Sequence, residues 1–164
     1  MIRIGHSFDL HRLETGKRLI IGGVEIPFDK GCVAVSDGDV LLHAVAESML
    51  GALALGDLGT HFPPSDPASQ DLDSSLILKT VYDKIKAHEY GVLNIDTMVY
   101  CEKPSLKTYK KLMQAHIAKL LGINENQVSV KATTMETLGP IGHQEAIAAS
   151  STVLLKQSSQ VVKL

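Results

Sequence analysis

Apolar and polar residues follow one another in short blocks along the chain, and their period changes from block to block. Alternating or β-rich blocks predict strands over residues 2–11, 94–102, 128–132 and 146–156. Apolar residues spaced three and four apart predict helices over 74–88 and 107–121. Strands and helices are therefore interleaved, which indicates a domain with a sheet and helices packed against it.

Two further stretches are marked by glycine and proline. Two β-rich runs flank Gly22-Gly23, and they predict a hairpin over residues 19–26 because both turn positions need positive φ. Residues 59–73 are rich in Pro, Ser and Asp and predict a long loop, which in a compact domain is usually functional or mobile.

The predicted elements define a fold of the α+β class. The hairpin requires antiparallel pairs, so we expect a mixed β-sheet packed by helices on one face, plus the small β-hairpin. The 164 residues are enough for one hydrophobic core and few for two. Since no internal repeat or linker divides the chain, we expect a single domain over residues 1–164.

Composition and charge narrow the class of protein. Sixteen basic and eighteen acidic residues give a formal net charge of −2, which argues against binding to nucleic acid or to a membrane surface. No apolar run approaches the roughly 20 residues needed to span a bilayer, and the N-terminus does not resemble a signal peptide. Cys32 and Cys101 do not form a disulfide framework, so we expect a protein of the reducing cytoplasm.

A polar stripe crosses the most apolar segment. Residues 39–55 predict a buried helix, capped by Ser36 with Asp39 three residues on as in a capping box. Asp39, His43 and Glu47 recur every fourth residue and share one face of this helix. The stripe could simply face solvent, but its width of one residue favours a cleft, because unpaired ionisable groups are costly in an apolar interior.

A second pair of polar residues suggests a metal site. Asp9 and His11 are two apart on a predicted strand and therefore lie on the same face. Combined with His43, they make one carboxylate and two imidazoles, the ligand set of a catalytic zinc with an open fourth position. Asp39 lies on the same stripe and could orient an imidazole. Alone, an Asp-x-His pair is more often an ordinary surface pair.

The segment KATTME, residues 131–136, directly follows a predicted strand. Two hydroxyls, backbone N–H groups and a lysine suit phosphate oxygens, and Glu136 could hold Mg²⁺ together with a substrate phosphate. Taken alone, a Thr-rich strand end running into a turn is the simpler interpretation.

These residues together resemble the 2-C-methyl-D-erythritol 2,4-cyclodiphosphate synthase family, nearly from end to end. The most specific motifs are RIGHSFDLH (residues 3–11), SDGDVLLH (36–43), GDLG (56–59) and KATTME (131–136). Several separate motifs in the same order make a chance similarity very improbable.

The resemblance implies a lyase of non-mevalonate isoprenoid biosynthesis. In the family reaction, the 2-phosphate of a cytidine-diphosphate-linked methylerythritol attacks the β-phosphate, CMP leaves and a cyclic diphosphate forms. The resemblance also implies a homotrimer with active sites between neighbouring subunits.

The family's residue roles carry over onto matching positions. Zinc would lie on Asp9, His11 and His43, Glu136 would hold Mg²⁺ or Mn²⁺, and Thr134 would stabilise the transition state. The implied substrate-binding residues are Asp9, His11, Ser36, Asp57, Leu58, Gly59, Phe62, Asp66, Pro104, Leu106, Thr133, Thr134 and Glu136.

The chain departs from the family pattern at four positions. The histidine that usually precedes the Ser-Asp-Gly-Asp run is Val35 here, which predicts weaker phosphate stabilisation unless His61 supplies the missing donor. Ser105 stands where a lysine is usual, Pro64 where the loop commonly has aspartate, and His143 where an arginine is common.

Two other functions remain open at this stage. A zinc phosphohydrolase needs the same open metal site but uses water as the nucleophile. A non-catalytic trimeric protein that binds cytidine nucleotides would keep the pocket, and Val35 and Ser105 favour it.

Overall fold

A five-stranded sheet with the strand order β4-β1-β7-β5-β6 forms the centre of the molecule. The computed structural model describes residues 1–158, so residues 159–164 of the predicted domain lie outside the described part. Neighbouring strands are antiparallel except β5 and β6, which pair in parallel, so the sheet is mixed as predicted. The strands are β1 (Ile2–Thr15), β4 (Lys30–Cys32), β5 (Tyr90–Tyr100), β6 (Val128–Thr133) and β7 (Ala146–Gln157).

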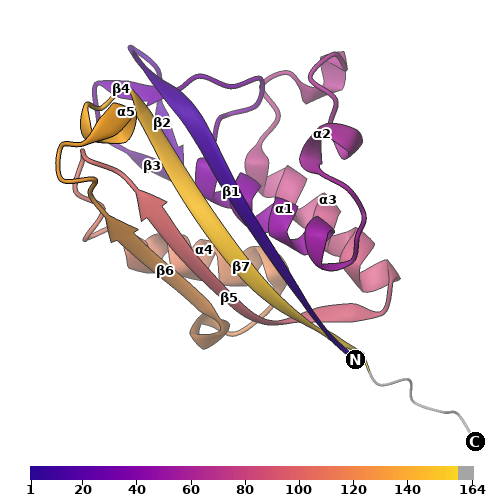
Figure 1. Ribbon diagram of the computed structural model, residues 1–164. Coiled ribbons are helices and arrows are strands. Elements are labelled where there is room, and N and C mark those ends of the chain that lie inside the picture. Colours follow the sequence, from indigo (N-terminus) through magenta and orange to yellow (C-terminus); the bar gives the residue numbers. More distant parts are fainter. Residues whose placement is uncertain (159–164) are drawn as a thin grey trace, which may run out of the picture.

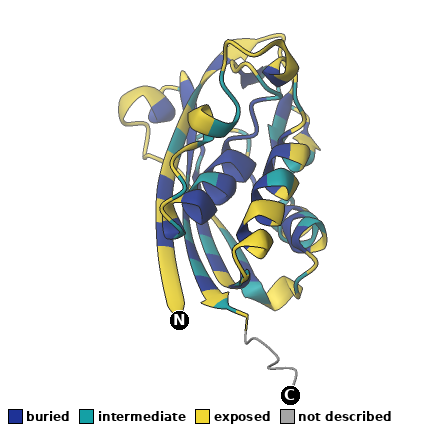
Figure 2. Cartoon of the chain, turned by 90° about the vertical axis from the view of Figure 1, so that its right-hand side faces the viewer, coloured by how far each residue is buried: buried dark blue, intermediate teal, exposed yellow. Residues whose placement is uncertain are grey.

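The three long helices lie together on one face of this sheet (Figures 1 and 2). They are α1 (Val40–Ala52), α3 (Ser74–Ala87) and α4 (Lys110–Leu121). Shorter helical turns are α2 (Leu58–His61), η1 (Pro67–Ser69), η2 (Glu125–Gln127) and α5 (Gly139–Gly142). The predicted α+β class, with helices packed on one face, is confirmed.

The predicted hairpin is a separate two-stranded sheet of β2 (Leu19–Ile21) and β3 (Val24–Ile26). Gly22 and Gly23 form its turn with φ of 61° and 74°, a conformation that side chains with a Cβ rarely adopt. The backbone N–H groups of both glycines donate to the Asp39 carboxylate, at 2.9 and 2.6 Å. The hairpin is therefore attached directly to the start of α1.

The prediction that Ser36 caps the first helix is wrong. Gly38, with φ of 75°, turns the chain so that Asp39 has extended backbone and becomes the N-cap of α1. The Asp39 carboxylate accepts from the N–H groups of Leu41 and Leu42.

Two other element boundaries differ from the sequence pattern. The long loop 59–73 contains η1 and most of α2, because Asp57 and Asp66 each cap a short turn. Strand β5 begins at Tyr90 instead of residue 94, because a register shift between Val92 and Asn94 breaks the alternation that marks a strand. The short elements β4 and α5 have no periodic signal.

Helix α1 packs unusually close to β1. A Cβ on Gly5 would lie 1.9 Å from the Ser48 carbonyl oxygen, so only glycine fits there. One pleat further along, the Ser7 hydroxyl donates to the Ala44 carbonyl oxygen at 2.7 Å. Because residues two apart share one face of a strand, this contact also turns Asp9 and His11 towards α1.

The other face of β1 is exposed and carries four large apolar side chains. Even-numbered residues point away from the helices, and the part of the chain that the structure describes places no long helix over them (Figure 2). The exposed large side chains on this strand are Ile2 (59%), Ile4 (68%), Phe8 (54%) and Leu10 (49%). We call these four residues the open sheet face.

Candidate metal centre and active site

The predicted triad Asp9, His11 and His43 meets in space. His11 Nε2 lies 3.0 Å from Asp9 Oδ2, His43 Nδ1 lies 3.2 Å from the same oxygen, and the two nitrogens are 3.1 Å apart. Strand β1 supplies the first two residues and α1 the third. All three side chains are partly buried, and within residues 1–158 theirs is the one cluster of His, Cys, Asp or Glu with this ligand spacing.

The triad fits a tetrahedral zinc ion. Ligands bound at about 2.0–2.1 Å in a tetrahedron lie roughly 3.3 Å from one another, close to the observed separations. Two imidazole nitrogens and one carboxylate oxygen are also the donor set of catalytic zinc sites that leave the fourth position open.

Electrostatics at the triad favour positive charge. Burial raises the pKa of Asp9, but hydrogen bonds with His11 and His43 outweigh burial, and the net pKa lies well below the ordinary value. Burial lowers the pKa of His43, yet the hydrogen bond with Asp9 outweighs it and the pKa is raised. The carboxylate therefore stays ionised and draws a cation to this position.

Sequence reasoning missed the groups on the far side of the His43 ring. His43 Nε2 lies 2.9 Å from the Ser74 hydroxyl and 3.1 Å from the Ser36 hydroxyl. The Ser74 hydroxyl in turn donates to Asp37 through a short hydrogen bond. No sequence signal joins these residues, because Ser74 lies 31 positions from His43 and meets it only through the packing of α3 on α1.

Asp39 does not orient an imidazole through any hydrogen bond of its carboxylate. Its two oxygens accept four backbone N–H groups, from the hairpin glycines and from the first turn of α1. The side chain is fully buried, and burial raises its pKa to about 6 against these hydrogen bonds. Asp39 thus holds the start of α1 one turn before His43, and its predicted role in orienting an imidazole stays a prediction.

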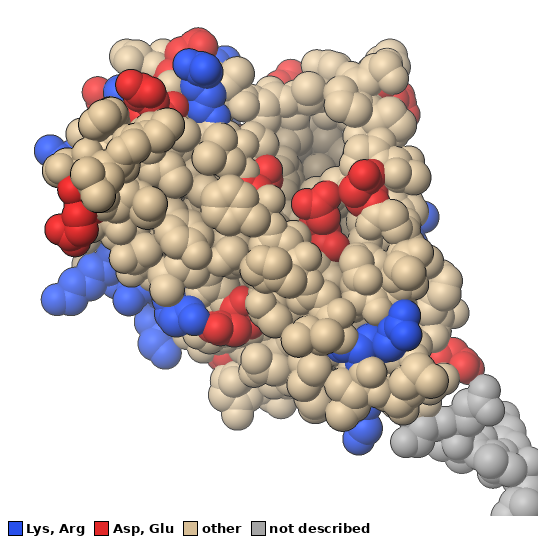
Figure 3. Space-filling view, viewed as in Figure 1, with Lys and Arg blue, Asp and Glu red and all other residues tan. Residues whose placement is uncertain are grey.

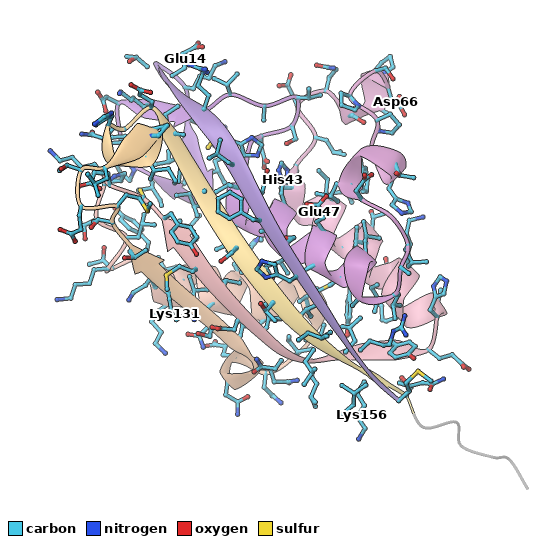
Figure 4. The ribbon with its side chains drawn as sticks, viewed as in Figure 1. Glu14, His43, Glu47, Asp66, Lys131 and Lys156 are labelled. Atoms are coloured by element: carbon cyan, nitrogen blue, oxygen red, sulfur yellow. The ribbon has the colours of Figure 1, made fainter. Side chains whose placement is uncertain are left out.

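A cavity of about 360 Å³ opens beside the triad. Figure 3 shows this side of the molecule hollowed between β1 and α2, with acidic side chains at the rim. In Figure 4, His43 and Glu47 follow one another along α1. Besides Asp9, His11 and His43, the lining contains the predicted residues Ser36, Leu58, Gly59 and Phe62, together with Val35 and Glu47.

Three other residues of the loop region do not line this cavity. Asp57 accepts from the Thr60 backbone and hydroxyl, and Asp66 accepts from the Ala68 N–H, so both carboxylates cap turns. Asp66 lies at the far end of the loop from His43 (Figure 4). His61 Nε2 is 2.9 Å from the Leu55 carbonyl oxygen, so that nitrogen already has a partner within the chain.

The remaining predicted residues gather at the end of β6. The Thr134 hydroxyl donates to Glu136 Oε1 at 3.2 Å, and Glu136 has a positive φ of 52°. A second cavity of about 600 Å³ lies beside them, and Lys103, Lys107 and Lys110 give it a basic rim. Its lining includes the predicted residues Pro104, Leu106, Thr133 and Thr134.

The predicted site residues thus form two groups within one chain. The first surrounds the metal triad between β1, α1 and α2, and the second surrounds the ends of β5 and β6. The two cavities have no lining residue in common within the described part of the chain. A substrate that needs both groups cannot be enclosed by one of these cavities alone.

Comparison with known proteins assigns the chain to a family. A sequence profile described as the YgbB family matches residues 2–156. Two curated relatives, both named 2-C-methyl-D-erythritol 2,4-cyclodiphosphate synthase, cover 96% of this chain and are themselves covered completely. The relative from Syntrophomonas wolfei is 46% identical over 157 residues, and that from Geobacillus kaustophilus is 49% identical over 158.

Solved structures show the same fold. The bifunctional IspDF from Campylobacter jejuni superposes with a TM-score of 0.92 at 40% identity; the match covers 96% of this chain and 42% of that longer chain. The Plasmodium falciparum IspF–CDP complex superposes with a TM-score of 0.85 at 34% identity, covering 96% and 97%.

The fold and the triad thus define an α+β domain with a candidate metal site, and its fold is the fold of these enzymes. The chain belongs to the YgbB family, the family of the 2-C-methyl-D-erythritol 2,4-cyclodiphosphate synthases. Among the residues that the structure describes, no helix has the length and apolar character needed to cross a membrane.

Proposed function

We propose that the protein converts 4-diphosphocytidyl-2-C-methyl-D-erythritol 2-phosphate to 2-C-methyl-D-erythritol 2,4-cyclodiphosphate in non-mevalonate isoprenoid biosynthesis. An oxygen of the 2-phosphate bonds to the β-phosphorus, the bond from that phosphorus to the bridging oxygen breaks, and CMP leaves with the bridging oxygen. The observation that carries this proposal is the intact Asp9–His11–His43 cluster beside a cavity, in a chain that matches its synthase relatives along their whole length.

We propose zinc for the triad and Mg²⁺ or Mn²⁺ for Glu136. Two nitrogens and one oxygen suit zinc, and the carboxylate of Glu136 is a hard oxygen ligand of the type that Mg²⁺ prefers. When bound, the two cations neutralise phosphate oxygens as Lewis acids. The Thr134 hydroxyl donates to Glu136 in the free protein, and we propose that it turns to donate to an oxygen of the reacting diphosphate once Glu136 holds the cation.

The chain's own contribution is mainly positioning, since an intramolecular phosphoryl transfer needs its nucleophile held in line. We assign the methylerythritol phosphate to the cavity beside the triad, where Leu58 and Phe62 offer apolar contact and Ser36 a hydroxyl. We also propose that Asp57 and Asp66 bind the methylerythritol phosphate, although their carboxylates cap turns in the free protein. We assign the cytidine to the second cavity, around Pro104 and Leu106. The CDP bound in the Plasmodium falciparum relative supports a nucleotide site.

We propose a homotrimer in which each active site lies between two subunits. The two cavities of one chain share no lining residue, which supports an assembly in which a neighbour brings its nucleotide pocket to each triad. The open sheet face supports this assembly, because Ile2, Ile4, Phe8 and Leu10 form an apolar surface that water covers in a lone chain. We propose the cytoplasm as its compartment, supported by two free, buried cysteines.

The proposed reaction is separated from its alternatives by its products. A ³¹P NMR time course with this substrate, Zn²⁺ and Mg²⁺ is expected to show CMP and a cyclic diphosphate. Orthophosphate would identify a phosphohydrolase, in which water is the nucleophile. No change with zinc bound would leave a nucleotide-binding protein without catalysis. His43→Ala is the control, and it is expected to abolish product formation.

Val35 offers a direct test of the departure from the family pattern. Its side chain lines the cavity beside the triad but cannot donate to a phosphate. Restoring the usual histidine with Val35→His is expected to raise kcat about tenfold, because a charge-assisted hydrogen bond to phosphate strengthens as charge develops. Steady-state kinetics check this, and an unchanged kcat would show that the position is immaterial.

A further inference from the structure

The hydrogen bonds behind His43 fix which of its nitrogens carries the proton. The Ser74 hydroxyl has a single proton, and the short contact with Asp37 uses it, since a carboxylate only accepts. Towards His43 the Ser74 oxygen is therefore an acceptor. The imidazole nitrogen that it meets, Nε2, must then be the N–H donor across their 2.9 Å contact.

This proton placement leaves a lone pair on the other nitrogen. His43 Nδ1 points at Asp9 Oδ2, 3.2 Å away, and at His11 Nε2, 3.1 Å away. In the neutral imidazole this nitrogen and the ionised carboxylate are both acceptors, and two acceptors at this separation repel unless a proton or a metal cation lies between them. The tautomer set by Ser74 is thus the one that a metal ligand requires.

The hydrogen-bonded pair Ser74 and Asp37, which we call the relay, is held in place at both residues. Ser74 is fully buried at the first turn of α3, and its backbone N–H donates to Asp37 Oδ2 at 3.1 Å. Asp37 Oδ1 also accepts from the Asp39 N–H, at 3.3 Å. Backbone hydrogen bonds from Asp37 N–H to the Leu72 carbonyl and from Asp71 N–H to the Val35 carbonyl join the two segments. The Asp37 carboxylate therefore cannot turn away without breaking several hydrogen bonds.

Ser36 is a weaker candidate for fixing which nitrogen of His43 carries the proton. Its hydroxyl lies 3.1 Å from His43 Nε2, but it accepts from the Gly38 N–H and has no carboxylate behind it. Its proton can rotate, so it does not dictate the tautomer. Ser36 also lines the cavity and is available to a substrate, whereas Ser74 does not line it.

We propose that Ser74 and Asp37 are positioning residues of the metal centre, which hold His43 as the Nε2–H tautomer with Nδ1 aimed at the metal. The proposal rests on the metal site of the proposed function. It assigns the orienting role to Asp37, acting through Ser74, instead of to Asp39. Neither residue touches substrate; both act through the affinity of the triad for its cation.

The test is the zinc affinity of purified variants, measured by competition with a chromophoric chelator. Ser74→Ala is expected to weaken binding about 10- to 100-fold, the usual cost of losing a hydrogen bond behind a histidine ligand. Ser75→Ala is the matched control: the neighbouring hydroxyl contacts His116 instead, and zinc affinity is expected to stay at the wild-type value. Asp37→Asn keeps the shape of the side chain and is expected to weaken binding less than Ser74→Ala.

A second readout reports the tautomer itself. Long-range ¹H–¹⁵N NMR spectra of zinc-depleted protein at alkaline pH are expected to show His43 as Nε2–H in the wild type. In Ser74→Ala the same ring is expected to gain Nδ1–H signal. A Ser74→Ala protein with wild-type zinc affinity and an unchanged tautomer would overturn the proposal while leaving the metal site intact. If His43→Ala also retained wild-type zinc affinity, both the proposed metal site and the proposed role of Ser74 and Asp37 would be wrong.

Discussion

Asp39 shows how one side chain joins two distant segments. Its carboxylate accepts from the two turn glycines of the hairpin and from the first turn of α1. All four donors are backbone groups inside the protein, so the loss of an acceptor would leave a buried N–H unsatisfied. The residue thereby fixes the start of the helix that carries His43.

Asp39→Asn is expected to lower the free energy of unfolding by about 1–3 kcal/mol. The asparagine amide keeps one acceptor oxygen, but its NH₂ group takes the place of the other. In one orientation the NH₂ faces the Gly23 N–H, and in the other it faces the N–H groups of Gly22 and α1. Two donors that face each other repel. Urea unfolding monitored by circular dichroism measures the effect. Asp73→Asn is the control, because Asp73 caps α3 at an exposed position where asparagine caps equally well. Equal stability of both variants would contradict the structural role of Asp39.

Sequence spacing predicted the triad but not the groups that hydrogen-bond to it. Asp9 and His11 share a strand face, and His43 belongs to a polar stripe on an apolar helix, so local periods of two and four residues were enough. The hydrogen bonds of Ser74 and Asp37 depend on how α3 packs against the turn before α1. Such contacts between distant segments leave no periodic trace in the chain.

At the scale of elements, the contact between α1 and β1 determines where the triad forms. Gly5→Ala would push a methyl group into the Ser48 carbonyl oxygen, so the helix must move. The expected result is a loss of about 1–3 kcal/mol of stability, together with weaker zinc binding. Chemical unfolding and chelator competition measure the two effects.

Gly51→Ala, on α1 itself, serves as the opposite control. A Cβ at Gly51 meets no atom within 4 Å, so the substitution is expected to stabilise the protein by about 0.5–1 kcal/mol. If Gly5→Ala were as stable as Gly51→Ala, the close packing of α1 on β1 would not be what places His43 beside Asp9.

Helix α4 contacts the hairpin through His116. The ring lies against Gly23 and its Nε2 is 3.1 Å from the Ser75 hydroxyl. Burial lowers the pKa of His116; Asp73 opposes this effect and Lys119 adds to it. The folded state therefore resists protonation of this ring, while the unfolded chain takes up a proton below about pH 6.5.

The contribution of His116 to stability is expected to fall as the pH drops below about 6.5, because at this ring the unfolded state then binds more protons than the folded state. His116→Gln is expected to reduce this slope. Unfolding free energies measured between pH 5 and 8 provide the test.

Element types were largely predictable, and element ends were not. Helices α3 and α4 follow a clear apolar period, and the Gly22-Gly23 turn identifies the hairpin. The start of β5 was missed because its register shift interrupts the alternation, and β4 because three residues carry no period. Local irregularities decide boundaries, while the overall period decides type.

At the scale of the whole molecule, the open sheet face is the main feature that a lone chain does not explain. Ile4 is 68% exposed on this face. Ile4→Asp is expected to convert a trimer to monomers, because a buried unpaired charge would cost several kcal/mol in the interface. Analytical ultracentrifugation measures the mass, and synthase activity is expected to disappear with the trimer.

Leu112→Asp is the matched control on the helical side of the molecule. Leu112 is 56% exposed on α4, so the same change in charge is expected to leave both mass and activity unaltered. A trimeric Ile4→Asp protein would exclude the open sheet face as the contact surface.

The division of the site into two cavities has a genetic consequence. In the proposed trimer, a chain that has lost His43 still offers its nucleotide pocket, and a chain that has lost Thr134 still offers its triad. Co-expressed, the two defective chains would complement each other, because a closed ring of three with mixed composition always contains one junction where the intact halves meet. The effect of a mutation in this gene would then depend on which other variant of the chain is co-expressed with it.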